Sequence, residues 1–527
     1  MNRLKTIMNF RRGTVLIALT TLVISGCTKK YADINTDQNS IATIGPAELP
    51  FLFSKAQSTA TNSQWNYQVA QNLFSDQYAQ YFACAATYFP SDRLVIRMDW
   101  VGAAFGPMYT DVVPQLQSIF TASDPASAEY ALASIMWVYT FHKITDYWGP
   151  IPYFNAGVPG TTVPYDAQDK IYDDFFKRLD AAVTVLKGKT GETPFGTYDL
   201  IYHGNVSEWI KFANTLRLRL AMRISKVDAA RAKTEAETAY ASGVLTASPT
   251  DDALIDRSTK GGDGNGLSIM SDWNEFRMSA SMESVLKGYN DPRMKEYFLP
   301  AKSTGTYEGM RNGLTAVQLG DPLNKADANS HVGARWASPD AGGSASYLAS
   351  RQNVMSTAEA YFLRAEGAMM GWNMGGTAKD LYEAGIRNSM KQWTTADDAT
   401  INAYIASSAT PIAPADYLNS PAMTNIPVAF DPSNATTQLE QIMTQKWLAM
   451  FPDGMEAWAD WRRSHVVKLY KPANSDNADI PDPNTQWIRR IPFLLSEVQV
   501  NGAEVTKAAA LLGGPDKVTT PLWWDKN

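Results

Sequence analysis

The chain has 527 residues, of which 45% are hydrophobic and 19% are charged, and its formal net charge is −6. An acidic chain is repelled by nucleic acid phosphates, so we exclude a nucleic acid partner. Its cysteines are Cys27 and Cys84, and lipidation of Cys27 would leave no pair for an intrachain disulfide.

Residues 1–26 have the layout of a bacterial secretory signal peptide that ends in a lipidation site. Basic residues come first, an apolar run follows at 15–19, and the segment closes on Gly26 and Cys27. The small Gly26 permits cleavage, and the thiol of Cys27 accepts the lipid. Because the apolar run is too short to span a membrane, we predict a lipoprotein signal peptide over 1–26 and a lipidated flexible tether over 27–45.

Apolar residues recur at spacings of three and four in the segments 128–148, 169–187 and 207–225. This period predicts amphipathic helices that each pack one face on their neighbours. In the third segment, the basic residues are expected mostly on other faces; they are Lys211, Arg217, Arg219 and Arg223.

A helical hairpin is predicted between residues 356 and 393. Ser356 with Glu359 and Thr377 with Asp380 fit the pattern of a capping box, in which a hydroxyl accepts from the free amides of the first helical turn. The glycines at 375 and 376 separate the two helices. The second helix has the small and aromatic spacing of a tetratricopeptide repeat. A third capping box, at 437–440, predicts the start of another helix.

Long polar stretches rich in Gly, Pro, Ser and Asn separate these helices at 246–270, 300–350 and 395–435. They are too broken for regular elements, and loops of such length are usually functional or disordered. We therefore expect residues 46–527 to form one domain, with a helical repeat platform and a loop-rich lobe built from loops near 246–350 and 395–435.

No motif in the chain points to catalysis, a metal or a cofactor. The histidines, at 142, 203, 331 and 465, lie outside metal-ligand spacing of one another and of Cys84. A nucleophile elbow of the G-x-S-x-G type is absent from the sequence. We predict no catalytic residues, no metal and no cofactor, although the paired carboxylates of a glycosidase would leave no local motif.

Stretches along almost the whole chain resemble the SusD/RagB family, in particular its SusD-like subgroup, the nutrient-binding outer-membrane lipoproteins of Bacteroidota. They are ADINTD at 32–37, KITDYWGPIPY at 143–153, WIKFANTLRLRLAMR at 209–223, AEAYFLRAE at 358–366 and QIMTQKWLAMFPDGMEAWADWRR at 441–463. The resemblance implies a mostly α fold, in which tetratricopeptide-like helical pairs form a platform and an irregular lobe carries the ligand site.

The resemblance also implies a function and a partner. Such a protein is anchored at Cys27 to the cell surface of the outer membrane, captures oligosaccharides and passes them to a TonB-dependent, SusC-like transporter barrel. It is not an enzyme. The alternatives are a peptide-binding lipoprotein of the same architecture, a surface glycoside hydrolase, and a structural or adhesive lipoprotein.

An oligosaccharide site needs aromatic faces that stack on sugar rings and planar polar groups that bond hydroxyls. Residues 89–91, Phe-Pro-Ser, break a helix and are expected to expose their neighbours, and a second region begins at Trp273. We predict ligand contacts at Tyr88, Asp92, Arg93, Trp100, Trp273, Tyr307 and Arg311. A further set of aromatics is interpreted as the buried side of one helix: Trp65, Phe74, Tyr78, Tyr81 and Phe82.

Overall fold

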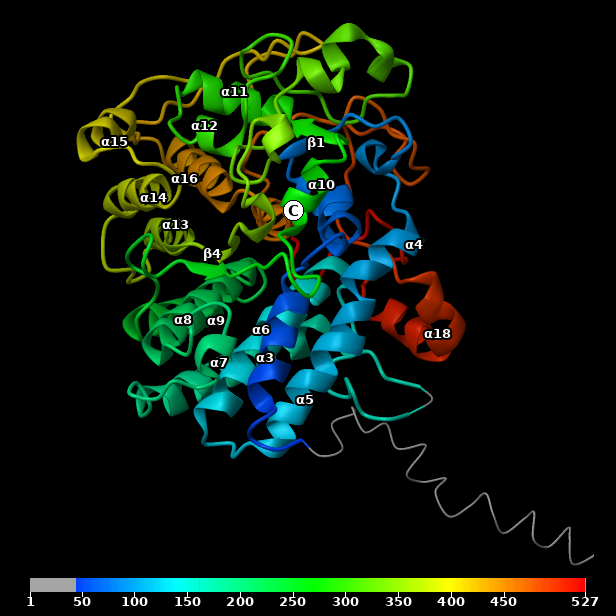
Figure 1. Cartoon of the computed structure of the whole chain (residues 1–527), viewed down its shortest axis with the longest axis vertical. Coiled ribbons are helices and arrows are strands. Elements are labelled where there is room, and N and C mark those ends of the chain that lie inside the picture. The colour runs from blue at the N-terminus through cyan, green and yellow to red at the C-terminus, as the bar shows by residue number, and fades with distance from the viewer. Residues whose placement is uncertain (1–43, 161, 527) are drawn as a thin grey trace, which may run out of the picture. The chain divides into compact units, whose positions relative to one another are not determined.

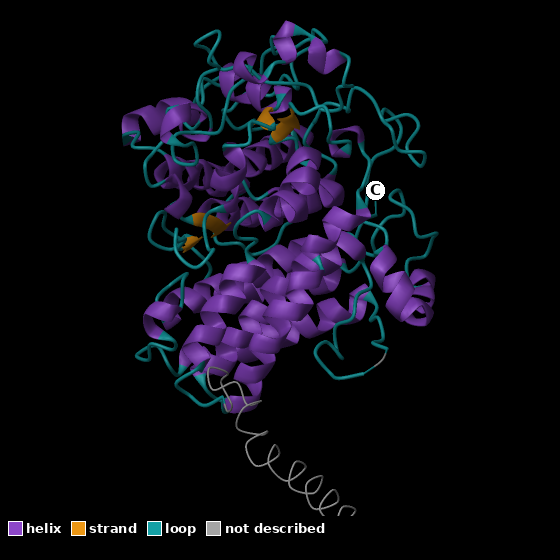
Figure 2. Ribbon diagram, turned by 45° about the vertical axis from the view of Figure 1, so that its right-hand side comes forward, coloured by secondary structure: helices purple, strands orange, loops and turns teal. Residues whose placement is uncertain are grey.

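The computed structural model describes residues 44–160 and 162–526. The predicted signal peptide, Cys27 and residues 27–43 of the predicted tether lie outside this range. The compact unit begins at Leu49. It is mostly helical, and most of its long loops gather at one end of the helical layers (Figure 1, Figure 2).

Helices packed in pairs form the platform that the sequence predicts. The pairs are α3 (Leu49–Ala60) with α5 (Val113–Ala122), α6 (Ala128–Trp148) with α7 (Gln168–Lys187), α8 (Val206–Arg223) with α9 (Ala229–Ala241), and α13 (Thr357–Met369) with α14 (Ala378–Trp393). Neighbouring pairs are joined because α7 packs on α8 and α13 also packs on α8. The mostly α, tetratricopeptide-like fold is therefore confirmed.

The predicted helices at 128–148, 169–187 and 207–225 form with nearly the expected bounds. The apolar stripe of α7 is buried as expected, whereas α6 is buried almost all round. The basic residues of α8 do not form a solvent-facing side, because Arg217, Arg219 and Arg223 are buried. α8 packs against α6, α7, α9 and α13, so little of its circumference is left for solvent.

Side-chain caps define where the hairpin helices start. Ser356 accepts from the backbone N–H of Glu359, and Thr377 accepts from that of Asp380, which confirms both predicted caps. The third predicted cap is wrong. α16 (Ala435–Met450) starts two residues before Thr437, and Asn434 caps it by accepting from the N–H groups of residues 436 and 437.

The lobe contains two antiparallel strand pairs and several short helices. β1 (Phe82–Cys84) pairs with β3 (Phe276–Met278), and β2 (Ala253–Ile255) pairs with β4 (Gln352–Met355). The short helices are α4 (Met98–Val101), α10 (Gly266–Ser271), α11 (Ala280–Gly288), α12 (Met294–Tyr297) and α15 (Asp398–Ile405).

The predicted loop segments are therefore not free of regular structure, because β2, α10 and α15 lie inside them. The apolar period is weak in α10 and α15, and a side-chain cap instead marks where each of these helices starts. Asn265 accepts from the N–H of Ser268 at α10, and Asp397 accepts from that of Thr400 at α15. Short 3-10 turns interrupt the long stretch between α12 and β4, namely Gln318–Gly320, Pro322–Asn324, Ala326–Ala328, Pro339–Ala341 and Tyr347–Ala349.

Further helices complete the described chain. They are the π-helices η1 (Gln68–Asp76) and η4 (Met108–Val112), together with α17 (Gly454–Ser464) and α18 (Leu495–Ala510). α17 packs directly on η1. A Cβ at Gly454 would lie 2.1 Å from a carboxylate oxygen of Asp76, so glycine permits this contact. Among residues 44–160 and 162–526, the structure has no helix that is both long enough and apolar enough to cross a membrane.

Substituting Gly385 with alanine tests the close packing of α13 on α14. A Cβ at Gly385 would lie 2.7 Å from the ring of Phe362, so we expect Gly385→Ala to lower the free energy of unfolding by about 1–3 kcal/mol. Gly502 in α18 has open space around it, and Gly502→Ala is the matched control, expected to change stability by no more than about 1 kcal/mol. Urea denaturation followed by circular dichroism measures both. Equal stabilities of the two variants would contradict this account.

Candidate functional site

Three large aromatic side chains are exposed on segments of the lobe that contact one another. Trp65, Tyr88 and Trp273 expose 61%, 64% and 42% of their surface, which is unusual for rings of this size. They come from three separate segments of the chain: the turn between α3 and η1, the loop after β1, and the turn after α10. We call these residues, together with Asp272 and Glu275, the aromatic surface.

Glu275 ties two of these segments together. Its carboxylate accepts from Gln68 Nε2 at 2.5 Å, one turn after Trp65, and from the hydroxyl of Tyr88. Its backbone carbonyl accepts from Ala85 N at 2.7 Å, extending the β1–β3 pairing. The third segment is fixed nearby, because Tyr347 donates to Asp272 Oδ2 at 2.6 Å.

Local backbone geometry explains why Trp65 and Trp273 point outward. Asn62 and Gln64 have positive φ values, +53° and +59°, so α3 ends and η1 starts on a new axis with Trp65 in the turn. Asn274, at φ +57°, similarly ends the segment after α10. Asparagine tolerates this left-handed conformation better than most residues, and it leaves the preceding Trp273 on the surface.

The polar groups of the aromatic surface are suited to hydrogen bonding with a neutral ligand. Partial burial and the hydrogen bond to Glu275 raise the pKa of Tyr88 to about 12. The hydrogen bond to Asp272 raises the pKa of Tyr347 to about 12 as well. Both phenols therefore stay protonated at neutral pH, and the carboxylates beside them offer acceptors for hydroxyl groups.

Of the predicted ligand contacts, Tyr88, Trp273 and Trp100 lie at or beside the aromatic surface. Trp100 contacts it through Phe89, whose ring lies 5.5 Å from that of Trp100 and 4.6 Å from that of Tyr88. One face of Trp100 is already occupied, because the Arg97 guanidinium lies 4.5 Å from its ring centroid. Tyr88 and Trp273 are more exposed than Trp100 and therefore offer more ring surface to a ligand.

Asp92 and Arg93 turn away from the aromatic surface. The expectation that the break at 89–91 exposes Asp92 is wrong: this side chain is buried and accepts from Asn312 Nδ2 at 2.9 Å and from Cys84 N at 3.2 Å. Burial raises its pKa to about 6. Arg93 pairs with Asp476 at 2.5 Å and donates to the carbonyl of Leu314. The 3-10 turn Ser91–Arg93 draws both residues inward.

Tyr307 and Arg311 do not join Trp273, although they follow it in the sequence. Tyr307 packs against the hydrophobic core, and burial raises its pKa. Arg311 donates to Lys471 O at 2.7 Å and lies 4.7 Å from the ring centroid of Tyr470. The guanidinium of Arg311 is therefore engaged in contacts within the protein.

The sequence interpretation missed Trp65, which it assigned to the buried side of a helix. Phe74, Tyr81 and Phe82 are buried as expected, but η1 starts after Trp65 and β1 begins at Phe82, so no single helix carries all of them. The polar run Thr-Asn-Ser-Gln at 61–64 is the signal that could have revealed the break before Trp65.

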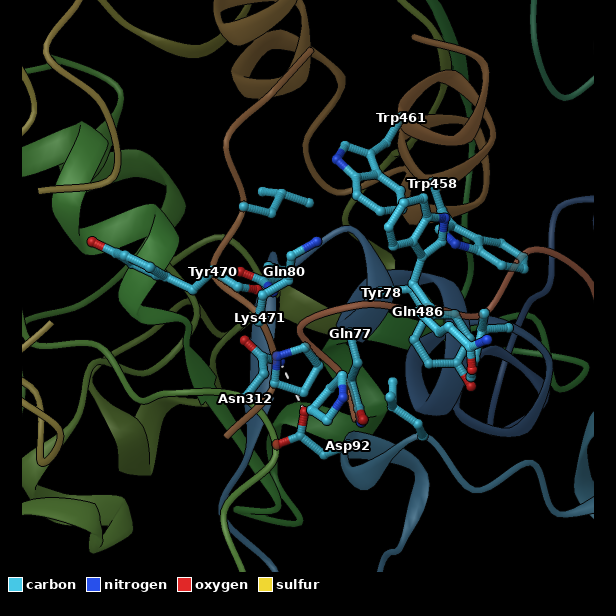
Figure 3. A pocket seen from close by; sticks show the side chains of 16 residues that line it. Gln77, Tyr78, Gln80, Asp92, Asn312, Trp458, Trp461, Tyr470, Lys471 and Gln486 are labelled. Carbon is cyan, nitrogen blue, oxygen red and sulfur yellow. Dashed lines mark hydrogen bonds between the residues drawn. The ribbon is translucent and has the colours of Figure 1, made fainter. Parts of the chain in front are cut away.

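A separate pocket lies between the end of η1, α17 and the segment 469–488 (Figure 3). The pocket and the open solvent space at its mouth together span about 550 Å³, and only a small part of this volume is enclosed. Its lining includes Gln77, Tyr78, Trp458, Trp461, Lys471 and Trp487, and none of these belongs to the aromatic surface. We name it the tryptophan pocket.

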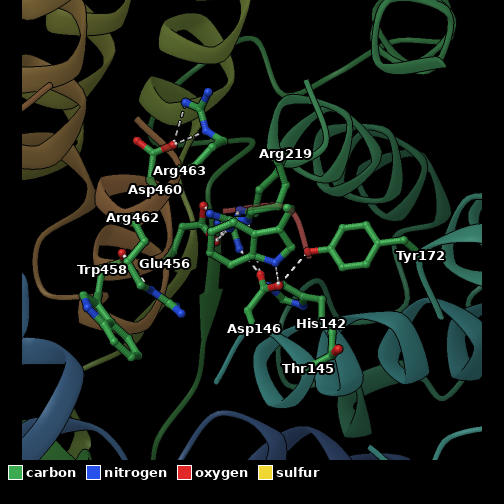
Figure 4. A network of polar contacts seen from close by, with 12 residues as sticks. His142, Thr145, Asp146, Tyr172, Arg219, Glu456, Trp458, Asp460, Arg462 and Arg463 are labelled. Atoms are coloured by element: carbon green, nitrogen blue, oxygen red, sulfur yellow. Dashed lines mark hydrogen bonds and ion pairs between the residues drawn. The ribbon is translucent and has the colours of Figure 1, made fainter. Parts of the chain in front are cut away.

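A cluster of buried charged side chains joins helices of the platform to α17 (Figure 4). Arg219 of α8 forms two bonds to Glu359 of α13, at 2.6 and 2.7 Å, and Arg223 bonds Glu456 of α17 at 2.6 Å. Asp146 of α6 lies 3.2 Å from Arg223 and accepts from Tyr172 and Trp524. We call these residues the buried ion network.

The buried ion network is structural in character, because its side chains are at most 4% exposed and engaged with one another. Burial alone would lower the pKa of Arg219, but Glu359 and Glu456 outweigh it and raise that pKa. Within the described part of the chain, no group of three or more His, Cys, Asp or Glu side chains has the geometry to hold a metal ion.

The helical pairs, the loop-rich lobe and its exposed rings together define a mostly helical protein with a tetratricopeptide-like platform. The chain belongs to the SusD-like family, because the family model described as "Susd and RagB outer membrane lipoprotein" matches residues 32–525. No curated protein matches the chain.

Solved structures agree with this assignment. A chitin-binding SusD homolog from Flavobacterium johnsoniae is 35% identical, with a TM-score of 0.80 over 91% of this chain and 98% of that one. A SusD homolog from Bacteroides vulgatus is 31% identical, with a TM-score of 0.81 over 91% of this chain and 98% of that one. A SusD homolog from Bacteroides thetaiotaomicron is 28% identical, with a TM-score of 0.80 over 91% and 99% of the two chains.

Removing one member of the buried ion network is expected to destabilise the fold strongly. Arg219→Met leaves the carboxylate of Glu359 buried without its main partner, which costs about 3–5 kcal/mol of unfolding free energy. The double variant Arg219→Met with Glu359→Leu removes both charges and recovers most of that loss. Chemical denaturation measures each variant.

The exposed pair Lys379–Glu383, at 2.7 Å on α14, is the matched control. Lys379→Met is expected to cost less than about 1 kcal/mol, since solvent screens the pair. A double variant no more stable than Arg219→Met alone would contradict the role assigned to the network.

Proposed function

We propose that this protein is a surface nutrient-binding lipoprotein that captures oligosaccharides at the aromatic surface for import through a TonB-dependent, SusC-like transporter barrel. It binds its ligand without covalent chemistry. The observation that carries the proposal is the exposure of Trp65, Tyr88 and Trp273 beside the hydrogen-bonded carboxylates Asp272 and Glu275.

The aromatic surface matches the two kinds of surface that a sugar ring presents. The axial C–H groups of a pyranose form an apolar face that packs on an aromatic ring, and the hydroxyls around its edge need donors and acceptors. Tyr88 and Trp273 supply rings, and Glu275 supplies an acceptor that also fixes the hydroxyl of Tyr88. Membership of the SusD-like family, and the chitin-binding homolog among the similar structures, support a glycan as the ligand.

The family also supports the cellular placement that we propose. The matched model describes outer membrane lipoproteins, and we assign the lipid to Cys27 at the end of the predicted signal peptide. Acyl chains on one terminal residue anchor a protein without a membrane-spanning helix. The tether that follows Cys27 would then let the domain reach the mouth of the transporter barrel.

Removing one ring of the aromatic surface is expected to weaken oligosaccharide binding. Tyr88→Ala or Trp273→Ala removes a stacking face, and we expect each to lower affinity about tenfold, corresponding to about 1.4 kcal/mol. Isothermal titration of the full chain in detergent, against a glycan panel that begins with chitin oligosaccharides, measures this effect.

Tyr198→Ala is the matched control, because Tyr198 is also exposed but packs on Phe51 of α3, outside the aromatic surface. It should bind like the unaltered chain. Binding of peptides with no response to any glycan would overturn the proposed ligand. Release of reducing sugar, lost on Glu275→Gln, would establish a hydrolase instead.

Replacing Cys27 is expected to release the protein from the membrane. Without the thiol, no diacylglycerol thioether forms, so Cys27→Ala should move the protein from the membrane to the soluble fraction and abolish labelling by radioactive palmitate. Protease treatment of intact cells should degrade the unaltered protein if it faces outward. Membrane retention of the alanine variant would contradict the proposed anchor.

A further inference from the structure

The tryptophan pocket contains buried polar groups that have no hydrogen-bonding partner among the described residues. Gln77 is only 3% exposed, yet neither its Nε2 nor its Oε1 makes a hydrogen bond to another described group. The same holds for the hydroxyl of Tyr78 and the indole N–H of Trp487. Unpartnered groups of this kind are costly in a folded protein, so their concentration in one pocket calls for a ligand.

Other amides in the same pocket are engaged within the protein. Asn312 Nδ2 donates to Phe82 O at 2.8 Å and to Asp92 at 2.9 Å, and Gln80 bonds both Ser281 and Tyr470 O. The unpartnered groups are therefore those of Gln77, Tyr78 and Trp487, and Figure 3 shows Gln77 and Tyr78 among the side chains that line the pocket.

Aromatic rings form the apolar walls around these groups. The rings of Trp461 and Trp487 are 5.7 Å apart and nearly perpendicular, at 73°, so they form a corner. His465 stacks on one face of Trp461 at 4.9 Å, which leaves the opposite face of that ring for a ligand. Tyr78 packs on Trp458 with 5.2 Å between ring centroids. The ammonium of Lys471 lies 4.7 Å from the Trp487 ring and forms no ion pair among the described residues.

We propose that the tryptophan pocket is a second carbohydrate site, which binds a single neutral sugar ring and is separate from the aromatic surface. The inference rests on the glycan-binding function proposed above, and it adds a site of different size and chemistry. The ligand class is a pyranose with two adjacent free hydroxyls.

The chemistry of Gln77 selects that class. A planar amide presents a donor and an acceptor side by side, so one sugar hydroxyl accepts from Nε2–H while its neighbour donates to Oε1. The phenol of Tyr78 and the indole N–H of Trp487 donate to further oxygens of the sugar. The tryptophan rings pack on the C–H face of the sugar. The ammonium of Lys471 donates a hydrogen bond to a neutral hydroxyl, so the ligand needs no charge.

Titration of the full chain with single sugars tests this site. The probes are D-glucose, D-galactose, D-mannose and N-acetyl-D-glucosamine, followed by tryptophan fluorescence and calorimetry. We expect at least one of them to bind and to alter the fluorescence, because three tryptophans line the pocket. Failure of all four sugars to bind would overturn the proposal.

Gln77→Met separates a binding role from a structural one. Methionine matches glutamine in length but removes both unpartnered atoms, so we expect at least a tenfold loss of affinity with an unchanged or higher melting temperature. Trp487→Ala changes a half-buried wall residue and should cause a similar loss. Binding by both variants that equals that of the unaltered chain would overturn the proposal.

Trp273→Ala keeps the two sites distinguishable, since it alters only the aromatic surface. Monosaccharide binding retained in Trp273→Ala but lost in Gln77→Met supports two separate sites. If Trp273→Ala weakens oligosaccharide binding while no single sugar binds, the proposed function is supported and the second site is refuted. If single sugars bind at Gln77 while Trp273→Ala and Tyr88→Ala leave oligosaccharide binding unchanged, the second site is supported and the aromatic surface is refuted as the oligosaccharide site.

Discussion

The ion pairs that Arg219 and Arg223 form are the contacts on which the rest of the architecture depends. They join α8 to α13 through Glu359 and to α17 through Glu456, and Asp146 adds α6 to the same network. α17 in turn packs on η1, the helix that carries Gln68 and follows Trp65. A chain of rigid contacts therefore runs from the centre of the platform to the aromatic surface.

Buried charges of this kind specify an arrangement more than they add stability. Taking two ions out of water costs about as much as their attraction returns, whereas leaving one of them unpaired is expensive. An apolar core tolerates small rotations and shifts of one helix on another. A bidentate pair such as Arg219 with Glu359 has one good geometry, which fixes how α13 sits on α8. For a binding protein, that fixed geometry matters because the exposed rings come from segments distant in sequence.

The same network marks where prediction from sequence failed. The apolar period located α6, α7 and α8 well, and hydroxyl caps located the hairpin α13–α14, because these signals are local. Whether Arg219 faces water or Glu359 depends on helices that lie more than a hundred residues away. Trp65 was misassigned for a related reason: its aromatic neighbours are buried, and positive φ at Asn62 and Gln64 turns it outward. The family resemblance supplied the platform and lobe, but the aromatic surface depends on contacts such as Gln68 with Glu275 that no short motif records.

The segment from Tyr88 to Leu94 stands between the aromatic surface and the tryptophan pocket. Tyr88 bonds Glu275 on one side, while Asp92 and Leu94 line the pocket on the other. Arg93 pairs with Asp476 in the same segment that contributes Lys471 and Trp487 to the pocket wall. The two sites have no lining residue in common, yet both are supported by this short stretch of backbone.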